Sequence, residues 1–337
     1  MSLVRYSRKS RINLAISSSL QNDISQLIKN EFNVVKNKLV TIEFENNYIN
    51  ELVQQVTITS KNGKLLRPIL TLLIGNFAPK SNEVIKENII NMAVAIELLH
   101  TASLVHDDIV DNATQRRGQE SFNNIYGNNM AVMMGDIIFA KSATFVCDTK
   151  NIDVVNKFAN TIVDLSMGQL LEMESRNNHF QTKDQYFYRI RKKTASLFET
   201  AVWSGGILSE FNYSDCNMLK NYGELLGYAF QIFDDVKDFS EIDKKSNNGK
   251  NPGIDIQNGI FTLPAILSFS DKNNNPFIGT DGNLDMCQTK EYLDSKGYLN
   301  ESIEIGNKYI QNAKKSLDQF SDTTLKLLLC KIADSIN

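Results

Sequence analysis

The 337-residue sequence lacks the marks of a secreted, nucleic-acid-binding or membrane-spanning protein. Its four cysteines are far apart and form no Cys-x-x-Cys pair, so we expect reduced thiols in a cytoplasmic protein. The net charge of −3 argues against a nucleic-acid surface. No apolar run reaches the ~18 residues of a membrane span, and the polar N-terminal stretch has no signal-peptide core.

Proline and β-type alternation are also scarce, since only five prolines interrupt the chain. Apolar residues instead recur at three- and four-residue spacing, which predicts an all-α fold. We find no linker, so we expect residues 1–337 to form a single large helical bundle. Polar stretches at 240–258, a candidate lid, and at 270–282 are expected to be loops. The expected helices cover 14–35, 42–56, 63–77, 82–111, 128–147, 154–174, 193–208, 218–239, a stretch from about 290, and 324–336.

Three carboxylates end the apolar stretch that begins at Glu97. Asp107 and Asp111 are four residues apart and share a helix face, with Asp108 beside them and His100 two turns earlier. Carboxylates one turn apart repel each other unless a cation lies between them, and oxygen ligands together with substrate phosphates suit Mg²⁺. A solvated acidic helix end is the plainer interpretation, but the apolar neighbours argue against it.

The same pattern recurs in a second apolar segment, where Asp234, Asp235 and Asp238 follow Gln231. Two such motifs on facing helices would hold several Mg²⁺ ions around one diphosphate. A helical interaction module with solvated carboxylates remains an alternative. Gln231 is either a ligand-binding side chain or an ordinary buried amide.

Basic groups that suit a phosphate ligand lie beside the expected turns. A helix start near Lys64 and Arg67 would favour an anion, and Arg116 with Arg117 would suit bidentate phosphate contacts. Each pair is also compatible with plain surface charge. The remaining candidates are Lys193 and Thr194, although Thr194 is equally compatible with a helix N-cap.

Taken in order, these motifs resemble those of the trans-isoprenyl diphosphate synthases, or polyprenyl synthetases, from about Gly63 to Pro264. The resemblance implies an isoprenoid-synthase bundle with a central apolar cavity and metal on Asp107, Asp111 and Asp234. The catalytic set it implies is Asp107, Asp108, Asp111, Lys193, Asp234 and Asp235. The implied substrate-binding residues are Lys64, Arg67, His100, Arg116, Arg117, Lys193, Thr194, Gln231 and Lys250.

The reaction implied is a Mg²⁺-dependent, head-to-tail condensation of isopentenyl diphosphate with an allylic diphosphate such as farnesyl or geranylgeranyl diphosphate. The small residues Ala102 and Ser103 precede the first aspartate where the family's short-chain members carry a bulky aromatic. They favour a trans product of geranylgeranyl length or longer, with Phe139 or Met134 as a deeper floor. Many members of the family carry a lysine at the position of Ile260, so this chain departs from the family in that one contact to the diphosphate.

Two other functions remain open beside this one and the helical interaction module. A terpene cyclase or head-to-head synthase is disfavoured because it needs no isopentenyl site such as Lys64, Arg67 and His100. A catalytically weak or regulatory subunit of a heteromeric synthase is disfavoured because both acidic motifs are intact. We expect a homodimer that binds no nucleic acid and contacts a membrane, at most, to release its product.

Overall fold

The computed structural model describes residues 18–61, 65–116, 118–240, 253–273, 275–277 and 284–336. Lys64, Arg117 and Lys250 lie outside the described residues, as do residues 241–252 of the expected lid. The helices are α1 (Ser18–Val40), α2 (Asn47–Lys61), α3 (Leu66–Asn76), α4 (Glu83–Val110), α5 (Phe122–Tyr126), α6 (Asn128–Asp148), α7 (Ile152–Glu174), α8 (Lys183–Ile190), η1 (Arg191–Ala195), α9 (Ser196–Leu208), α10 (Tyr213–Ser240), α11 (Ile254–Gln257), α12 (Leu263–Ser268), α13 (Met286–Ser295), α14 (Tyr298–Ser316) and α15 (Thr323–Asp334).

The described chain is helical apart from one pair of two-residue strands, which confirms the all-α prediction. Strands β1 (Gln115–Arg116) and β2 (Gln119–Glu120) pair antiparallel just after the first acidic motif. Gly118 between them has a positive φ of 75°, which glycine adopts without the steric cost that a Cβ would add. The hairpin turns the chain back so that Arg116 faces the end of α4.

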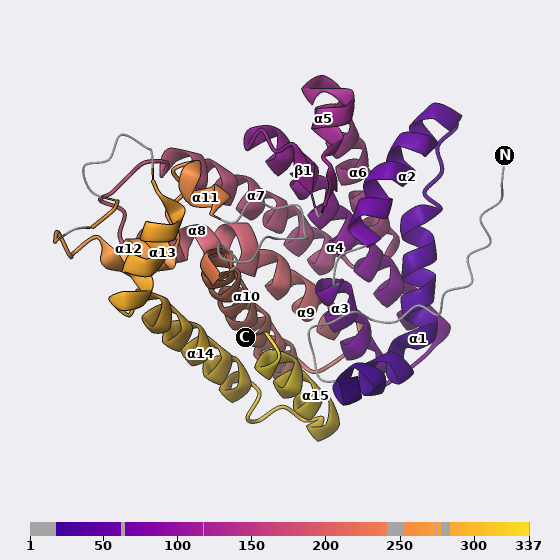
Figure 1. Cartoon of the computed structure of the whole chain (residues 1–337). Helices are drawn as coiled ribbons and strands as arrows, with labels where there is room; N and C mark the ends of the chain where they lie inside the picture. Colours follow the sequence, from indigo (N-terminus) through magenta and orange to yellow (C-terminus); the bar gives the residue numbers. More distant parts are fainter. Residues whose placement is uncertain are drawn as a thin grey trace.

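Helix α4 lies in the middle of the bundle and is buried along most of its length. Asn82 caps its first turn by accepting a hydrogen bond from the amide of Ile85. It packs against α3, α6 and α9, while α10 packs against α9 and α14. In Figure 1, α1 and α2 lie on one side of this centre and α13 and α14 on the other. Two long core helices, α4 and α10, therefore carry the two acidic motifs.

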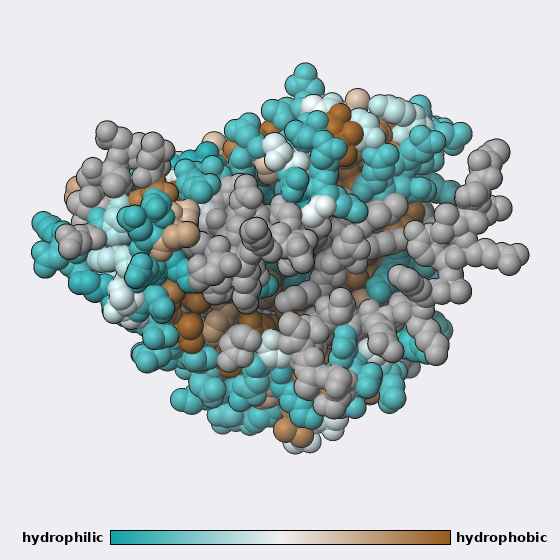
Figure 2. Space-filling view, viewed as in Figure 1, coloured by the Kyte–Doolittle hydropathy of each residue, from teal (hydrophilic) through white to brown (hydrophobic). Residues whose placement is uncertain are grey.

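The main hydrophobic core spans helices from α1 to α15, and a second apolar cluster lies around α8, α12 and α13. Figure 2 shows hydrophobic side chains in the middle of one face, between hydrophilic rims. Helices α4 and α6 are long and apolar enough to cross a membrane by length and composition alone. In α4, 72% of the apolar window is buried inside the protein, as expected of a core helix, against 33% in α6.

Helix boundaries differ from the sequence prediction in two places that matter for the site. Helix α2 begins at Asn47, because Asn46 caps its first turn through the amides of Tyr48 and Ile49. The helix expected to start at Lys193 begins at Lys183 instead, behind a capping box formed by Thr182 and Gln185. Thr194 therefore lies within a continuous helical stretch, and its interpretation as an N-cap is wrong.

Candidate active site

The first acidic motif occupies the last turn of α4, where its three carboxylates have different surroundings. Asp107 and Asp111 are partly exposed, whereas Asp108 is only 5% exposed. Arg116 donates from Nε to the Asp108 carboxylate at 2.8 Å. Asp108 is therefore paired with a protein cation, which leaves Asp107 and Asp111 as the two carboxylates of this motif best placed for a metal ion.

The sequence prediction missed two charged residues near this motif, one in the last turn of α7 and one just after that helix. Arg176 donates to the Asp111 carboxylate at 2.8 Å, and Glu172 forms an ion pair with Lys193. Both were overlooked because a single acidic or basic residue at a helix end carries no distinctive spacing. Together they bring the charges of α7 to the first acidic motif.

Lys193 and Thr194 lie in η1, a π-helical turn between α8 and α9. Single π-turns inside helices occur most often at functional sites. Glycines on the two neighbouring helices allow their backbones to approach the backbone of η1 closely. A Cβ added at Gly168 of α7 would lie only 2.5 Å from the backbone nitrogen of Lys193. A Cβ at Gly227 of α10 would lie 2.5 Å from the Ala195 Cα. The turn is held between two backbones, and this fixes the direction of Lys193 and Thr194.

A chain of hydrogen bonds joins this turn to the second acidic motif on α10. Thr194 donates to the Gln231 side-chain oxygen at 2.6 Å, and the Gln231 amide donates to Asp235 at 2.8 Å. Asp235, which is 5% exposed, also accepts a 2.6 Å hydrogen bond from Tyr186. Asp234 is exposed. Within this motif, Asp234 is thus the carboxylate open to a metal ion, and Asp235 holds the neighbouring side chains in place.

The third carboxylate of this motif, Asp238, connects α10 to the segment that follows residues 241–252. It accepts a 3.1 Å hydrogen bond from the amide of Gly253. That segment is also joined to the end of α7, because the Asn177 amide donates to the Gly259 carbonyl at 2.8 Å. These contacts place Asp255 and Ile260 beside the site.

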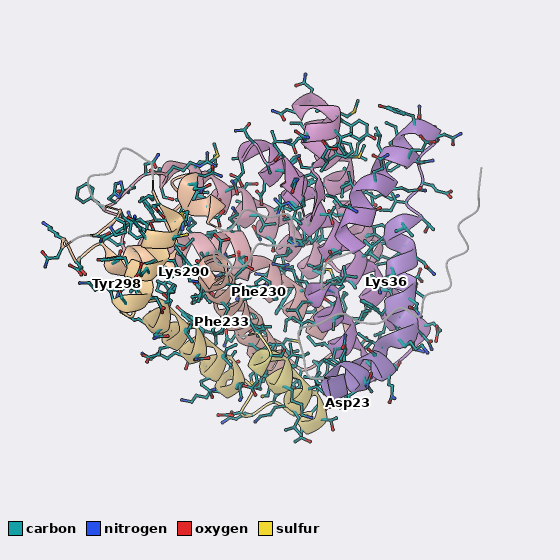
Figure 3. All side chains as sticks on the ribbon, viewed as in Figure 1. Asp23, Lys36, Phe230, Phe233, Lys290 and Tyr298 are labelled. Atoms are coloured by element: carbon teal, nitrogen blue, oxygen red, sulfur yellow. The ribbon has the colours of Figure 1, made fainter. Side chains whose placement is uncertain are left out.

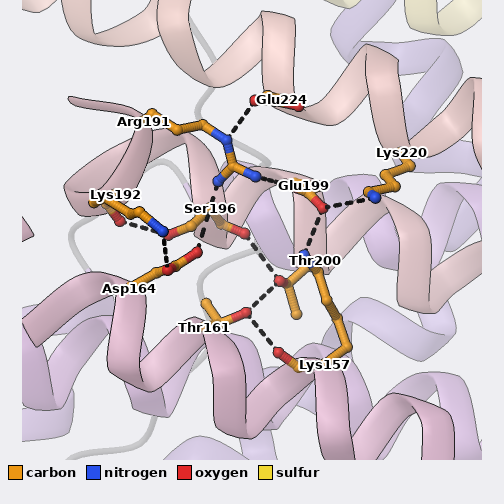
Figure 4. A network of polar contacts seen from close by, with 10 residues as sticks. All are labelled: Lys157, Thr161, Asp164, Arg191, Lys192, Ser196, Glu199, Thr200, Lys220 and Glu224. Carbon is orange, nitrogen blue, oxygen red and sulfur yellow. Dashed lines mark hydrogen bonds and ion pairs between the residues drawn. The ribbon is translucent and has the colours of Figure 1, made fainter. Parts of the chain in front are cut away.

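Behind η1, a network of charged side chains surrounds Glu199, which is fully buried on α9 (Figure 4). Arg191 donates to Glu199 at 2.6 Å and also pairs with Glu224 of α10, while Lys157 of α7 pairs with Glu199. Lys192 donates to Asp164 of α7 at 2.6 Å. The network ties η1 to α7 and α10 on the side away from Lys193, so Lys192 and Lys193 serve opposite faces of the same turn.

Electrostatics at the two motifs favour a bound cation. Burial raises the pKa of Asp107 to about 6, although Lys193 opposes the shift, and burial raises the pKa of Asp235 to about 7. Burial alone would lower the pKa of Lys193. The nearby carboxylates of Glu172 and Asp107 raise this pKa by more than burial lowers it, so that the net shift is upward. Lys193 therefore keeps its charge, and Asp107 is a carboxylate that a metal ion would stabilise in the ionised form.

The donor set fits a hard divalent ion, because every candidate ligand is a carboxylate oxygen. Among the residues that the structure describes, no group of three or more His, Cys, Asp or Glu side chains is arranged to enclose a metal ion. Mg²⁺ does not require such a group, because it usually keeps several waters and takes one or two carboxylates plus substrate phosphates.

Both acidic motifs border one small pocket of about 90 Å³. It brings together residues from five segments of the chain. The predicted residues that line it are Asp111, Lys193, Thr194, Gln231 and Asp235, and Glu172 joins them from α7.

The predicted isopentenyl site is described only at Arg67 and His100. The Arg67 guanidinium lies 4.3 Å from the ring centre of Phe198 and 5.8 Å from that of Phe230, which Figure 3 shows near the middle of the molecule. His100 is partly exposed on α4. Stacking on two aromatic rings holds the Arg67 guanidinium plane in one orientation.

The predicted chain-length residues lie along α4 and α6. Ala102 is fully buried in the main core with Met134, and Phe139 packs against that core from α6. Ser103 is partly exposed and donates to the His100 carbonyl at 2.8 Å. A larger pocket of about 530 Å³ lies beside α4, lined by Leu104 and Val105 of that helix and by Phe122 and Tyr126 of α5.

An α-helical bundle whose two aspartate motifs border one pocket with lysine, threonine and glutamine defines a prenyltransferase of the isoprenoid-synthase fold. The chain belongs to the polyprenyl synthetase family, whose model matches residues 47–282.

Among its relatives, a prenyl transferase of Cyanidium caldarium is 31% identical over 80% of this chain and 84% of its own length. Heptaprenyl diphosphate synthase component 2 of Geobacillus stearothermophilus is 30% identical over 76% of this chain and 79% of its own. The solved structure of a polyprenyl synthase from Caulobacter crescentus CB15, complexed with calcium and isoprenyl diphosphate, superposes with a TM-score of 0.83. It is 26% identical and covers 94% of this chain and 96% of that one.

Proposed function

We propose that this enzyme condenses isopentenyl diphosphate head-to-tail with an allylic diphosphate, farnesyl or geranylgeranyl diphosphate, in a Mg²⁺-dependent reaction. The observation that carries the proposal is the pocket in which Asp111 of the first motif meets Lys193, Thr194 and Gln231. Cations and hydrogen-bond donors beside metal-binding carboxylates are what a diphosphate leaving group requires.

In this mechanism the allylic carbon–oxygen bond breaks and its electron pair leaves with the diphosphate. Mg²⁺ held by Asp107, Asp111 and Asp234, when bound, would neutralise that group. Lys193 and Thr194 bind the diphosphate oxygens, with Lys250 from outside the described residues. Their positive charge and hydrogen bonds stabilise the charge that develops as the bond breaks.

The second half of the reaction is carbon–carbon bond formation. The double bond of isopentenyl diphosphate attacks the allylic carbon while Lys64, Arg67, His100 and Arg117 hold the second diphosphate. A proton then leaves to restore an alkene, and we assign its uptake to the departing diphosphate, because the sequence offers no obvious general base. The apolar walls of the bundle exclude water, which would otherwise react with the allylic cation that forms when the carbon–oxygen bond breaks.

We further propose that the product has geranylgeranyl length or longer. We also propose that the whole chain forms one catalytic domain and that the enzyme works in the cytoplasm. The small side chains of Ala102 and Ser103 support this length, and the name of the Geobacillus relative points to a heptaprenyl product in that protein. The four free cysteines fit a reducing compartment. We expect the apolar product to leave toward a membrane.

A homodimer is the assembly we propose, because the neighbouring helices α6 and α7 both expose large apolar side chains. Met133 on α6 is 55% exposed, and Val163 and Leu170 on α7 are 55% and 65% exposed. A second copy packed on these helices would remove that surface from water. The name "component 2" of the Geobacillus relative supports the alternative of a second, different subunit.

The test is incubation with farnesyl diphosphate, labelled isopentenyl diphosphate and Mg²⁺, followed by chromatography of the labelled products. Elongated trans-prenyl diphosphates are the expected result. A hydrocarbon made from farnesyl diphosphate alone would indicate a cyclase. The absence of product from a folded protein that still binds Mg²⁺ and inorganic diphosphate would favour a subunit that requires a partner.

A further inference from the structure

Arg189, near the end of α8, is a buried cation whose partners are neutral. Its side chain is only 3% exposed. It donates to the Ser175 hydroxyl at 2.7 Å and to the Phe261 carbonyl at 2.8 Å. Across the described ranges, no carboxylate lies within ion-pair distance of its guanidinium. Nothing in the sequence marked this arginine, which sits in an ordinary amphipathic helix.

The other cations around the site are paired differently. Lys193 has Glu172, Arg176 has Asp111, and Arg116 has Asp108, each within ion-pair distance. A buried charge is stable when an opposite charge compensates it, and neutral hydrogen-bond acceptors do so only in part. Arg189 is therefore the buried cation beside this pocket whose charge is left for an anion from outside the protein.

The position of Arg189 identifies where that anion would bind. Arg189 lines the 90 Å³ pocket together with Lys193, Thr194 and Gln231. Its guanidinium lies 5.6 Å from the ring centre of Tyr186, which in turn donates to Asp235 of the second motif. The Phe261 carbonyl and the Ser175 hydroxyl fix the guanidinium from two sides, so it is held in place before any ligand arrives.

We propose that Arg189 is a further substrate-binding residue, whose charge attracts the diphosphate of the allylic substrate into this pocket. The proposal rests on the prenyltransferase function proposed above, and it assigns to Arg189 a role beyond joining α8 to the segment after Gly259. Because the guanidinium is already oriented, binding costs little side-chain entropy, and a charge-assisted contact to phosphate is stronger than a neutral one.

Ile260 provides the means of separating charge from structure. It is 4% exposed and lines the same pocket as Arg189, but from the segment that follows Gly259. A lysine at this position would bring a second cation to the same cavity without restoring the hydrogen bonds to Ser175 and Phe261. If charge is what Arg189 supplies, lysine at 260 replaces it; if Arg189 only ties two segments together, lysine at 260 does not.

The experiment compares the parent protein with Arg189→Met, Ile260→Lys and the double variant. The apparent affinity for inorganic diphosphate with Mg²⁺ is measured by thermal shift, and KM for farnesyl diphosphate and kcat are measured separately. We expect Arg189→Met to weaken diphosphate binding and raise KM about tenfold or more. Ile260→Lys should recover most of that loss in the double variant, while the melting temperature without ligand stays low.

Two further variants keep the test decisive. Ser175→Ala removes one acceptor of Arg189 and keeps its charge, so it should lower the melting temperature without weakening diphosphate binding. If Arg189→Met does not fold, Arg189→Gln retains donors without the charge and is paired with Ile260→Lys in the same way. Unchanged diphosphate affinity in the neutral variants, or no recovery by Ile260→Lys, would overturn the proposal. A parent protein that binds diphosphate but makes no prenyl product would overturn the proposed function, and the variants would then test diphosphate binding by Arg189 alone.

Discussion

Thr194 and Gln231 are 37 positions apart, yet the threonine hydroxyl donates a 2.6 Å hydrogen bond to the glutamine side chain. This bond joins η1 to α10 and passes on, through the Gln231 amide, to Asp235. It couples the residue proposed to bind the leaving diphosphate to the motif proposed to bind metal.

Breaking that connection should impair substrate binding more than stability. We expect Gln231→Leu, which leaves the Thr194 hydroxyl and Asp235 without this partner, to raise KM for the allylic diphosphate and lower kcat/KM about tenfold or more. Steady-state kinetics over a range of farnesyl diphosphate concentrations gives both constants. Gln231→Glu keeps an acceptor for Thr194 but replaces the donor to Asp235 with a second carboxylate, so it tests the second half of the connection separately. Wild-type kinetics for Gln231→Leu would contradict the connection.

If both acidic motifs bind metal, removing one metal-binding aspartate from either motif should lower turnover. Asp107→Ala and Asp234→Ala should each reduce kcat about 10²-fold or more, since each removes charge stabilisation of the leaving group. Asp136→Ala on α6 removes a carboxylate that is 60% exposed and paired at 3.5 Å with His106, so it should change kcat little. Near-normal turnover of both variants with farnesyl diphosphate and Mg²⁺ would contradict metal binding by Asp107 and Asp234.

The raised pKa of Asp107 predicts how stability changes with pH in the absence of metal. Its folded pKa of about 6 lies above the unfolded value of 3.8, so the unfolded chain loses this proton first as pH rises. The contribution of Asp107 is thus present below pH 3.8 and is lost as pH rises toward and through about 6. Asp107→Asn should flatten this part of the stability profile, as measured by urea unfolding at pH 4.5 to 7.5. Saturating Mg²⁺ with diphosphate should stabilise the parent most at the upper end.

The buried network behind η1 predicts a stability effect that is separate from chemistry. Glu199→Gln leaves Lys157 and Arg191 without their shared carboxylate and should lower the free energy of unfolding by about 3 kcal/mol. Glu224→Gln removes the more exposed partner of Arg191, 28% exposed against 0% for Glu199, and should cost much less. Denaturant unfolding of both variants measures the difference. Equal costs would mean that burial of Glu199 contributes nothing.

Product length should respond to a ring placed below Asp107. Ala102→Phe would shorten the main product, but Ala102 is fully buried, so overpacking would also cost about 1–3 kcal/mol. Ser103→Phe is the better variant, because Ser103 is partly exposed and the ring has more room. The first condensation should stay near its parental rate while later additions stop early. Chromatography of the products from farnesyl diphosphate measures this, and an unchanged length distribution in a folded, active variant would mean that Ser103 does not face the growing chain.

The sequence predicted the fold class because helical periodicity depends on local spacing, and the family resemblance supplied most of the candidate site residues. Asp107 and Asp111 share a face of any α-helix, and the predicted Lys193, Thr194 and Gln231 do line one pocket. Helix α8 was missed because it has only eight residues and most of them are polar, although Thr182 and Gln185 form a recognisable capping box. The roles of Glu172, Arg176 and Arg189 depend on contacts between segments far apart in the chain, which spacing does not encode.

Gly168 and Gly227 affect the order in which parts of the structure form during folding. The π-helical turn between them is not a low-energy structure for an isolated peptide, and it lies between two backbones separated by 59 residues of sequence, from Gly168 to Gly227. Lys193 and Thr194 therefore reach their working positions only when α7 and α10 have docked on either side. Amide protons of residues 191–195 should then exchange with solvent only when those helices come apart, at rates set by global rather than local opening.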